Sequence, residues 1–175
     1  NISCPNIARG GALVGGTPES ASEVVKAVRD RVHRPLLVKM APVRVPEIAR
    51  ACEAAGADAL CLINTINGMH LNVRTRRSML SKPTGGVSGP AIHAIAVRMV
   101  WEAANAVKIP INGMGGVATW EDAAEMILAG ATSVTVGTAS FYDPTAAVKI
   151  VDGLAAWAAE QGVSDINELI GAAEC

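Results

Sequence analysis

Short apolar runs alternate with helical patterns along most of the chain. Residues 35–40 form a strand-type run, and apolar positions with helical spacing follow at 45–55. The order then repeats three times, with a strand and a helix expected at 59–63 and about 90–106, at 109–112 and about 120–129, and at 133–136 and about 144–161. The pattern therefore predicts four βα units.

One more helix is expected before the first complete unit. Thr17 suits the N-cap and Pro18 the first helical position. The residues expected on its apolar face are Ala21, Val24, Val25, Val28 and Val32. Because a helix follows residues 1–6, we expect Asn1 to lie at the end of a strand whose earlier residues are missing.

Strands that are apolar on both faces and alternate with helices predict a parallel sheet covered by helices. The candidates are a doubly wound sheet and a (β/α)8 TIM barrel. No Gly-x-Gly-x-x-Gly opens a βαβ unit, which disfavours a dinucleotide-binding doubly wound fold. A whole barrel needs roughly 200 to 250 residues. We therefore predict an α/β chain that forms the C-terminal half of a TIM barrel, as a single domain over residues 1–175.

Composition adds little to this fold but excludes several classes of function. Half of the 175 residues are apolar, and 15 Lys and Arg residues stand against 16 Asp and Glu residues. No apolar run reaches the roughly 18 residues of a membrane span, and no leader opens the sequence, so the expected location is the cytoplasm. The near-neutral charge and few aromatic residues argue against nucleic-acid binding.

The cysteines and histidines suggest no metal site. Cys4, Cys52, Cys61 and Cys175 lack the paired spacing of zinc or iron–sulfur ligands. Cys52 and Cys61 lie in apolar patterns, so we expect both to be small core residues. The single histidines, His33, His70 and His93, are expected on the surface or in loops.

Two glycine-rich turns predict an anion site. Gly113-Met114-Gly115-Gly116 directly follows one strand, with Thr119 as a plausible N-cap of the next helix, and the next strand ends in Val136-Gly137-Thr138-Ala139. Glycines let backbone N–H groups approach an anion closely. Barrels commonly build a phosphate site after their last two strands. Either turn alone could be a simple strand-to-helix connection, but the two in succession favour a phosphate cradle.

Other polar residues fall at strand ends. Lys39 closes an apolar strand, either as a lysine reaching solvent or as a group that stabilises an anionic cofactor. A long connection at 64–88 is of the length that is usually functional. Its run Arg74-Thr75-Arg76-Arg77 is expected to face solvent or another subunit.

Cys4 is the strongest candidate for proton transfer. A thiol becomes a base once its surroundings stabilise the thiolate. Asn1, Ser3 and Asn6 offer hydrogen bonds at the same strand end, which suits a planar, amide-rich substrate.

Together these motifs resemble one family in order and spacing, over almost the whole chain. They are residues 1–6 (NISCPN), 63–69 (INTINGM), 85–92 (GGVSGPAI), 113–116 (GMGG) and 136–139 (VGTA). The resemblance is to class 1 dihydroorotate dehydrogenase, and within it to the NAD-linked type 1B catalytic subunit. It implies a (β/α)8 barrel with FMN at its C-terminal mouth. On this comparison the chain begins at the end of the fourth strand, and such a segment alone is expected to be poorly stable and inactive.

The resemblance also implies roles for individual residues. Cys4 is the expected catalytic base, which removes the C5 proton of dihydroorotate while the C6 hydride passes to FMN. The expected substrate-binding residues are Asn1, Asn6, Asn64 and Thr65. The expected FMN-binding residues are Asn1, Lys39, Ile63, Gly89, Gly115, Gly116, Gly137 and Thr138.

The same family implies partners that would explain the missing cluster cysteines. We expect a homodimer of catalytic subunits and an electron-transfer subunit that carries FAD and a [2Fe–2S] cluster and passes electrons to NAD. The chain departs from the family at the short connection 40–46 and at Asn72, where an acidic residue is expected. Two alternatives stay open: a pyrimidine-reducing domain like that of dihydropyrimidine dehydrogenase, and a non-catalytic half barrel that binds a phosphate or flavin.

Overall fold

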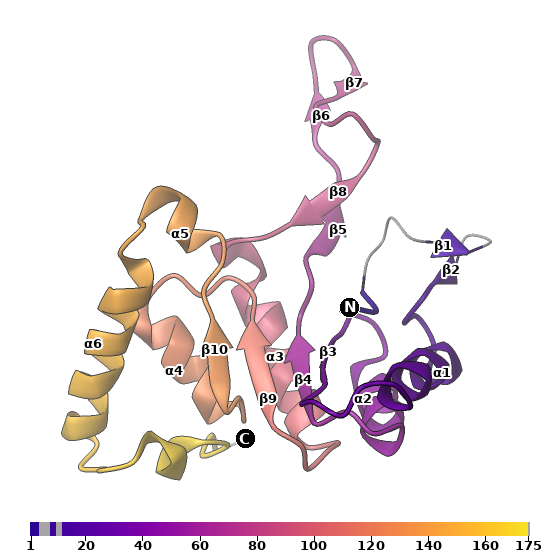
Figure 1. The fold of residues 1–175 in the computed structure, drawn as a ribbon. Coiled ribbons are helices and arrows are strands. Elements are labelled where there is room, and N and C mark those ends of the chain that lie inside the picture. Colours follow the sequence, from indigo (N-terminus) through magenta and orange to yellow (C-terminus); the bar gives the residue numbers. More distant parts are fainter. Residues whose placement is uncertain (4–7, 10–11, 175) are drawn as a thin grey trace.

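A four-stranded parallel sheet forms the centre of the molecule (Figure 1). The computed structural model describes residues 1–3, 8–9 and 12–174. The sheet has the order β10-β9-β4-β3, built from β3 (Leu37–Lys39), β4 (Ala59–Leu62), β9 (Ile111–Met114) and β10 (Ser133–Thr135). The amide of Ile2 donates to the carbonyl of Lys39 at 3.2 Å, so the start of the chain lies along the edge of β3.

Helices connect these strands in the predicted order. They are α1 (Pro18–Arg29), α2 (Val45–Ala54), α3 (His93–Ala104), α4 (Trp120–Leu128), α5 (Ala139–Tyr142) and α6 (Ala146–Glu160), with short 3-10 helices η1 (Pro90–Ile92) and η2 (Ile166–Leu169). The four βα units are confirmed, and so is the half-barrel class, since four parallel strands are half of the eight in a (β/α)8 barrel.

Local boundaries differ from the expectation in two places. Strand β9 begins at Ile111 and continues through Gly113 and Met114, which were expected in the following turn. Helix α5 was not predicted, because four residues are too few to show a helical period.

Capping residues fix where two of the helices begin. The hydroxyl of Thr17 accepts from the amide of Ser20 ahead of Pro18, as expected. In α4, Thr119 and Asp122 form a reciprocal capping box. Both helices therefore start where their sequence signals predict.

The core lies between the sheet and its helices. Val38, Leu60, Leu62 and Ile111 point into it and are almost fully buried, as is Cys52 on α2. The residues that alternate with them along the strands are partly or wholly exposed, namely Lys39, Cys61, Asn112 and Thr135. The strands were described from the sequence as apolar on both faces, but the second face of this sheet is partly exposed and carries polar groups.

Helix α1 was expected to bury a continuous apolar face, but only part of it is buried. Ala21 and Val25 are buried, whereas Val28 is 37% exposed. Val24 is partly buried against the core. The buried stripe is therefore narrower than the pattern predicted.

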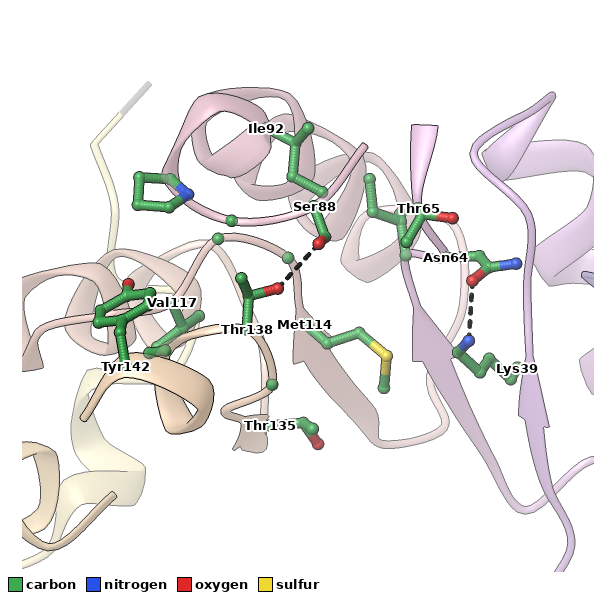
Figure 2. A pocket seen from close by; sticks show the side chains of 17 residues that line it. Lys39, Asn64, Thr65, Ser88, Ile92, Met114, Val117, Thr135, Thr138 and Tyr142 are labelled. Atoms are coloured by element: carbon green, nitrogen blue, oxygen red, sulfur yellow. Dashed lines mark hydrogen bonds between the residues drawn. The ribbon is translucent and has the colours of Figure 1, made fainter. Parts of the chain in front are cut away.

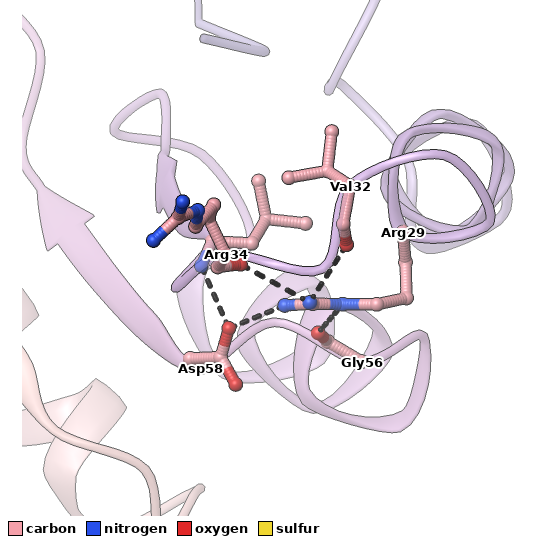
Figure 3. Close-up of polar contacts among 6 residues, drawn as sticks. Arg29, Val32, Arg34, Gly56 and Asp58 are labelled. Atoms are coloured by element: carbon pink, nitrogen blue, oxygen red, sulfur yellow. Dashed lines mark hydrogen bonds and ion pairs between the residues drawn. The ribbon is translucent and has the colours of Figure 1, made fainter.

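An arginine joins two loops at the amino end of the strands (Figure 3). Arg29, at the end of α1, donates to the carbonyls of Gly56 at 2.8 Å and Val32 at 3.1 Å, and pairs with Asp58. Asp58 also accepts from the amide of Leu36 at 2.6 Å. These contacts tie α1 to the loops that enter β3 and β4.

The long connection at 64–88 folds into an arm of two stacked ribbons rather than a loop. Strands β5 (Ile66–Gly68) and β8 (Gly85–Val87) pair antiparallel, and β6 (Leu71–Asn72) pairs with β7 (Arg77–Ser78) at the tip. The arm projects from the carboxyl end of the sheet (Figure 1). A further pair, β1 (Ala8–Arg9) with β2 (Ala12–Leu13), precedes α1.

The chain exposes more surface than its mass predicts for a closed monomer. Its accessible surface is 10289 Å², against about 8000 Å² for a compact 18.0 kDa protein. The open face of the sheet and the arm account for part of this excess. In the part of the chain that the structure describes, no helix is long and apolar enough to cross a membrane.

Candidate active site

A cavity of about 180 Å³ lies at the carboxyl ends of the sheet strands (Figure 2). Its lining includes nine residues that were predicted for the site: Lys39, Ile63, Asn64, Thr65, Gly89, Gly115, Gly116, Gly137 and Thr138. They come from five segments that lie far apart in the sequence. Small-molecule sites usually enclose roughly 300 to 1,000 Å³, so this cavity is smaller than a typical cofactor site.

The glycine turns leave backbone close to the cavity. Gly115 and Gly116 have φ of +131° and +75°, a region that side-chain-bearing residues rarely adopt. A Cβ on Gly116 would come within 2.7 Å of the Cβ of His93, whereas Gly137 has open space around it. The backbone around Gly137 is therefore open on its side-chain side, whereas the Gly116 turn is tightly packed, and the anion site stays a prediction.

Hydroxyl groups join the two sides of the cavity. Thr138, just after β10, donates to Ser88 Oγ at 2.9 Å (Figure 2). Ser88 and Tyr142 also line the cavity, although neither was predicted as a site residue. The position of Ser88 just before Gly89-Pro90, at the start of a helix, was a signal for it, but Tyr142 depends on the unpredicted α5.

A chain of polar contacts leads away from the cavity at Lys39. The ammonium of Lys39 donates to Asn64 Oδ1 at 3.0 Å, and Asn64 Nδ2 donates to the carbonyl of Ser3 at 2.6 Å (Figure 2 shows the first contact). The hydroxyl of Ser3, which is buried, donates to Asn1 Oδ1 at 2.7 Å. Asn1 is outside the cavity lining but joined to it through this chain.

The expected role of Cys4 is not tested, because Cys4 and Asn6 lie outside the described residues. Of the other cysteines, Cys52 is fully buried, and burial raises the pKa of its thiol to about 11. Cys61 is partly exposed on the open face of the sheet. Burial raises the pKa of the Cys61 thiol, and the charge of Lys39 opposes that rise. The prediction of a core position is therefore confirmed for Cys52. Cys61 is only partly buried, so the prediction holds for it only in part.

The prediction of a surface or loop position is wrong for His93. His93 begins α3 and is only 8% exposed, whereas His33 and His70 are exposed. The burial of His93 could not be read from the sequence of α3, because its side chain is covered by α4 and by the Gly115 turn.

The donor set fits a phosphorylated cofactor such as FMN better than a metal. Among residues 1–3, 8–9 and 12–174, no group of three His, Cys, Asp or Glu side chains is placed to hold a metal ion. Two glycine turns, the paired hydroxyls of Thr138 and Ser88, and the Lys39 ammonium instead offer hydrogen-bond donors to an anion. Buried Ile63 adds an apolar wall beside them.

Comparison with known proteins places the chain in one family. The dihydroorotate dehydrogenase family model matches residues 1–157. The chain is 52% identical over 174 residues to the catalytic subunit of dihydroorotate dehydrogenase B (NAD(+)) from Geotalea uraniireducens, covering 98% of this chain and 57% of that protein. It is 52% identical over 176 residues to the same subunit from Trichlorobacter lovleyi, covering 99% of this chain and 58% of that protein. The chain thus spans a little over half the length of these relatives.

A solved structure has the same fold. The crystal structure of DHODH in complex with ferulenol from Eimeria tenella superimposes with a TM-score of 0.81. The match covers 98% of this chain and 52% of that one, at 24% sequence identity. At this identity the likeness shows the fold alone.

Proposed function

The chain belongs to the dihydroorotate dehydrogenase family, and we propose that it acts in the catalytic subunit of an NAD-linked dihydroorotate dehydrogenase. The proposed reaction is the oxidation of dihydroorotate to orotate in pyrimidine (UMP) biosynthesis. The observation that carries the proposal is the cavity, where Lys39, Asn64 and two glycine turns meet at the carboxyl end of a half-barrel sheet. Barrel enzymes place their active sites at this end.

The cavity residues suit FMN. Gly115, Gly116, Gly137 and Thr138 would hold its phosphate, through backbone N–H groups and a hydroxyl. Buried Ile63 and the turn at Gly89 would line its ring and ribityl chain, and Lys39 would lie near the ring edge that gains negative charge on reduction. When bound, FMN supplies the acceptor for the hydride from C6 of dihydroorotate.

The substrate is proposed to bind on the Asn64 side of the cavity. Asn64 and Thr65, with Asn1 and Asn6, would hydrogen-bond its carboxylate and amide groups. Asn64 already donates to the carbonyl of Ser3, so the segment that leads to Cys4 lies next to the cavity wall. The Cys4 thiolate would take the C5 proton as the C6 hydride leaves, and the C5=C6 double bond of orotate would form.

Partners are part of the proposal. The relatives are named as catalytic subunits, which supports an electron-transfer subunit, proposed to carry FAD and a [2Fe–2S] cluster and to reduce NAD. We also propose a homodimer of catalytic subunits. Apolar side chains on the arm support a protein contact there, since Val73 is 86% exposed and Met69 58%. The cytoplasmic location stays a prediction.

The test uses the protein expressed from its full-length gene together with its partner subunit. The purified complex is expected to be yellow, to release FMN on denaturation, and to oxidise dihydroorotate with reduction of NAD. Cys4→Ala is expected to keep the colour and lose at least about 100-fold in kcat, as typical of removing a general base. Cys61→Ala, which changes a thiol outside the cavity lining, is the matched control.

Three other results would contradict the proposal. Colour without turnover would indicate a binding protein. Oxidation of dihydrouracil in preference to dihydroorotate would favour the dihydropyrimidine dehydrogenase-like alternative. An unchanged rate in Cys4→Ala would remove Cys4 as the base.

A further inference from the structure

His93 lies directly behind the glycine turn of the proposed phosphate site. It is the first residue of α3, and its side chain is about nine-tenths buried. It does not line the cavity, whereas its contact residues Gly115 and Gly116 do. The Gly115–Gly116 turn therefore contacts both His93 and the cavity, whereas His93 itself does not reach the cavity.

One ring nitrogen of His93 holds the turn. Nδ1 lies 3.0 Å from the carbonyl oxygen of Gly115. A carbonyl oxygen only accepts hydrogen bonds, so Nδ1 carries the proton and donates it. This contact fixes the direction of the Gly115 carbonyl.

That direction also fixes the amide of Gly116. The peptide bond between Gly115 and Gly116 is not among the cis bonds of the described residues, so it is trans. In a trans peptide the C=O and the following N–H point in opposite directions. With the carbonyl turned to His93 Nδ1, the Gly116 N–H points away from the His93 ring.

The packing leaves little freedom for another arrangement. A Cβ on Gly116 would come within 2.7 Å of His93 Cβ and 2.8 Å of the carbonyl oxygen of Gly89. The start of α3, the Gly89 turn and the Gly116 turn are thus in contact. His93 stands where these three segments meet.

The other ring nitrogen faces helix α4. Nε2 is buried and makes no hydrogen bond among the described residues. The carboxylate oxygens nearest to it are Asp122 Oδ1 at 3.6 Å and Glu125 Oε2 at 3.5 Å. Asp122 is itself held by the amides of Ala118 and Thr119 through its second oxygen, Oδ2. The ring is thus enclosed between α4 and the turn.

We propose that His93 is a positioning residue of the phosphate site, which directs the Gly116 N–H to an anion in the cavity by holding the Gly115 carbonyl. The inference rests on the proposed FMN function. On this proposal, His93 contributes to the binding of the phosphate group of FMN and not to the binding of the flavin ring. Its signature is therefore a change in the discrimination between FMN and riboflavin, which lacks the phosphate.

The test measures dissociation constants of FMN and riboflavin by fluorescence quenching, with the full-length enzyme and its partner subunit after removal of flavin. His93→Leu removes the donor, and the loss of one hydrogen bond to a neutral carbonyl is expected to weaken FMN binding by up to about tenfold. Riboflavin binding is expected to stay unchanged. His93→Asn, whose amide nitrogen can take the place of Nδ1, is expected to keep most of the FMN affinity. His33→Asn, at an exposed position, is the control and should change neither.

The outcomes separate the inference from the function it rests on. Equal losses for FMN and riboflavin in His93→Leu would indicate a general packing role and overturn the inference, as would no loss for FMN. A His93→Asn variant that melts like the parent but binds FMN as weakly as His93→Leu would also overturn it. If the parent enzyme binds no FMN, the proposed function fails and the inference fails with it.

Discussion

The two ends of the parallel sheet use polar groups in opposite ways. At the amino end, the Arg29 guanidinium donates hydrogen bonds to the carbonyls of Gly56, Val32 and Arg34. It also pairs with Asp58 (Figure 3). At the same end, Glu53 Oε1 accepts from the amides of Lys108 and Ile109 at 2.8 and 3.2 Å. These polar groups are satisfied by other parts of the chain.

The carboxyl end instead leaves polar groups facing a cavity. Lys39 has Asn64 as its hydrogen-bond partner, and the backbone around Gly137 has open space beside it. The comparison indicates that the amino end holds the loops together, whereas the carboxyl end leaves open space beside its polar groups. Substitutions at the two ends should therefore affect different measurements.

The largest effect is expected from Gly116→Ala at the carboxyl end. The new methyl group meets His93 and the Gly89 carbonyl, and backbone strain and overpacking each cost about 1–3 kcal/mol. We expect the affinity of the full-length enzyme for FMN to fall by roughly 100-fold, measured by flavin titration. Gly162→Ala is the matched control, because Gly162 also has a positive φ of +71° but has no atom close to its Cβ position. Equal FMN affinities in both variants would argue against a cofactor at this turn.

A second large effect is expected from Lys39→Met. Removing a positive charge placed where negative charge develops typically costs about 100-fold or more in kcat, so turnover of dihydroorotate should fall by that factor. The melting temperature should change little, because Lys39 makes one side-chain hydrogen bond among the described residues. Lys26→Met, on the exposed side of α1, is the control. Unaltered kcat in Lys39→Met would show that this lysine does not serve the reaction.

Arg29→Ala at the amino end should change stability rather than binding. The side chain is 27% exposed and joins α1 to two loops, so its loss is expected to lower the free energy of unfolding by about 2 kcal/mol in urea denaturation. The dissociation constant for FMN should stay that of the parent. Arg50→Ala, at an exposed position of α2, should change neither quantity. Weaker FMN binding in Arg29→Ala would contradict the conclusion that the amino end affects stability but not cofactor binding.

The smallest effect concerns pH and Asp58. The hydrogen bond from the Leu36 amide, followed by that from Arg29, holds the pKa of the Asp58 carboxyl below its usual value. Because the pKa of Asp58 is lower in the folded state, the ionised carboxylate stabilises the fold at pH values above about 4, which is the pKa of Asp in the unfolded chain. This stabilisation is lost as the pH falls through the lower pKa that Asp58 has in the folded state. The difference in melting temperature between parent and Asp58→Asn should therefore shrink on acidification below about pH 4. A constant difference would contradict the assignment.

The fold was predictable where the signal is local. Thr17 with Pro18 marks the start of α1, and Thr119 marks that of α4, because capping depends on residues within one turn. The arm was predicted as a loop, since the pairing of Ile66 with Val87 joins residues far apart and Gly-rich strands have little strand propensity. The order of the βα units followed from the apolar runs alone.

The site was predictable in part for a similar reason. Lys39, Asn64 and the glycine turns each follow a strand, and parallel strands bring their carboxyl ends to one edge. The burial of His93 was not predictable, because it depends on Asp122 and Glu125 of another helix. The role of Cys4 stays a prediction.

The arm at 64–88 has a consequence for how such an enzyme can be altered. Its two ends pair with each other through Ile66 and Val87, so the chain leaves β4 and enters η1 at nearly the same place. The part of the arm beyond β5 and β8, residues 69–84, can therefore be lengthened, shortened or exchanged without moving the cavity residues at its base. The arm is thus a module, and its surface can diverge while the chemistry below it is kept.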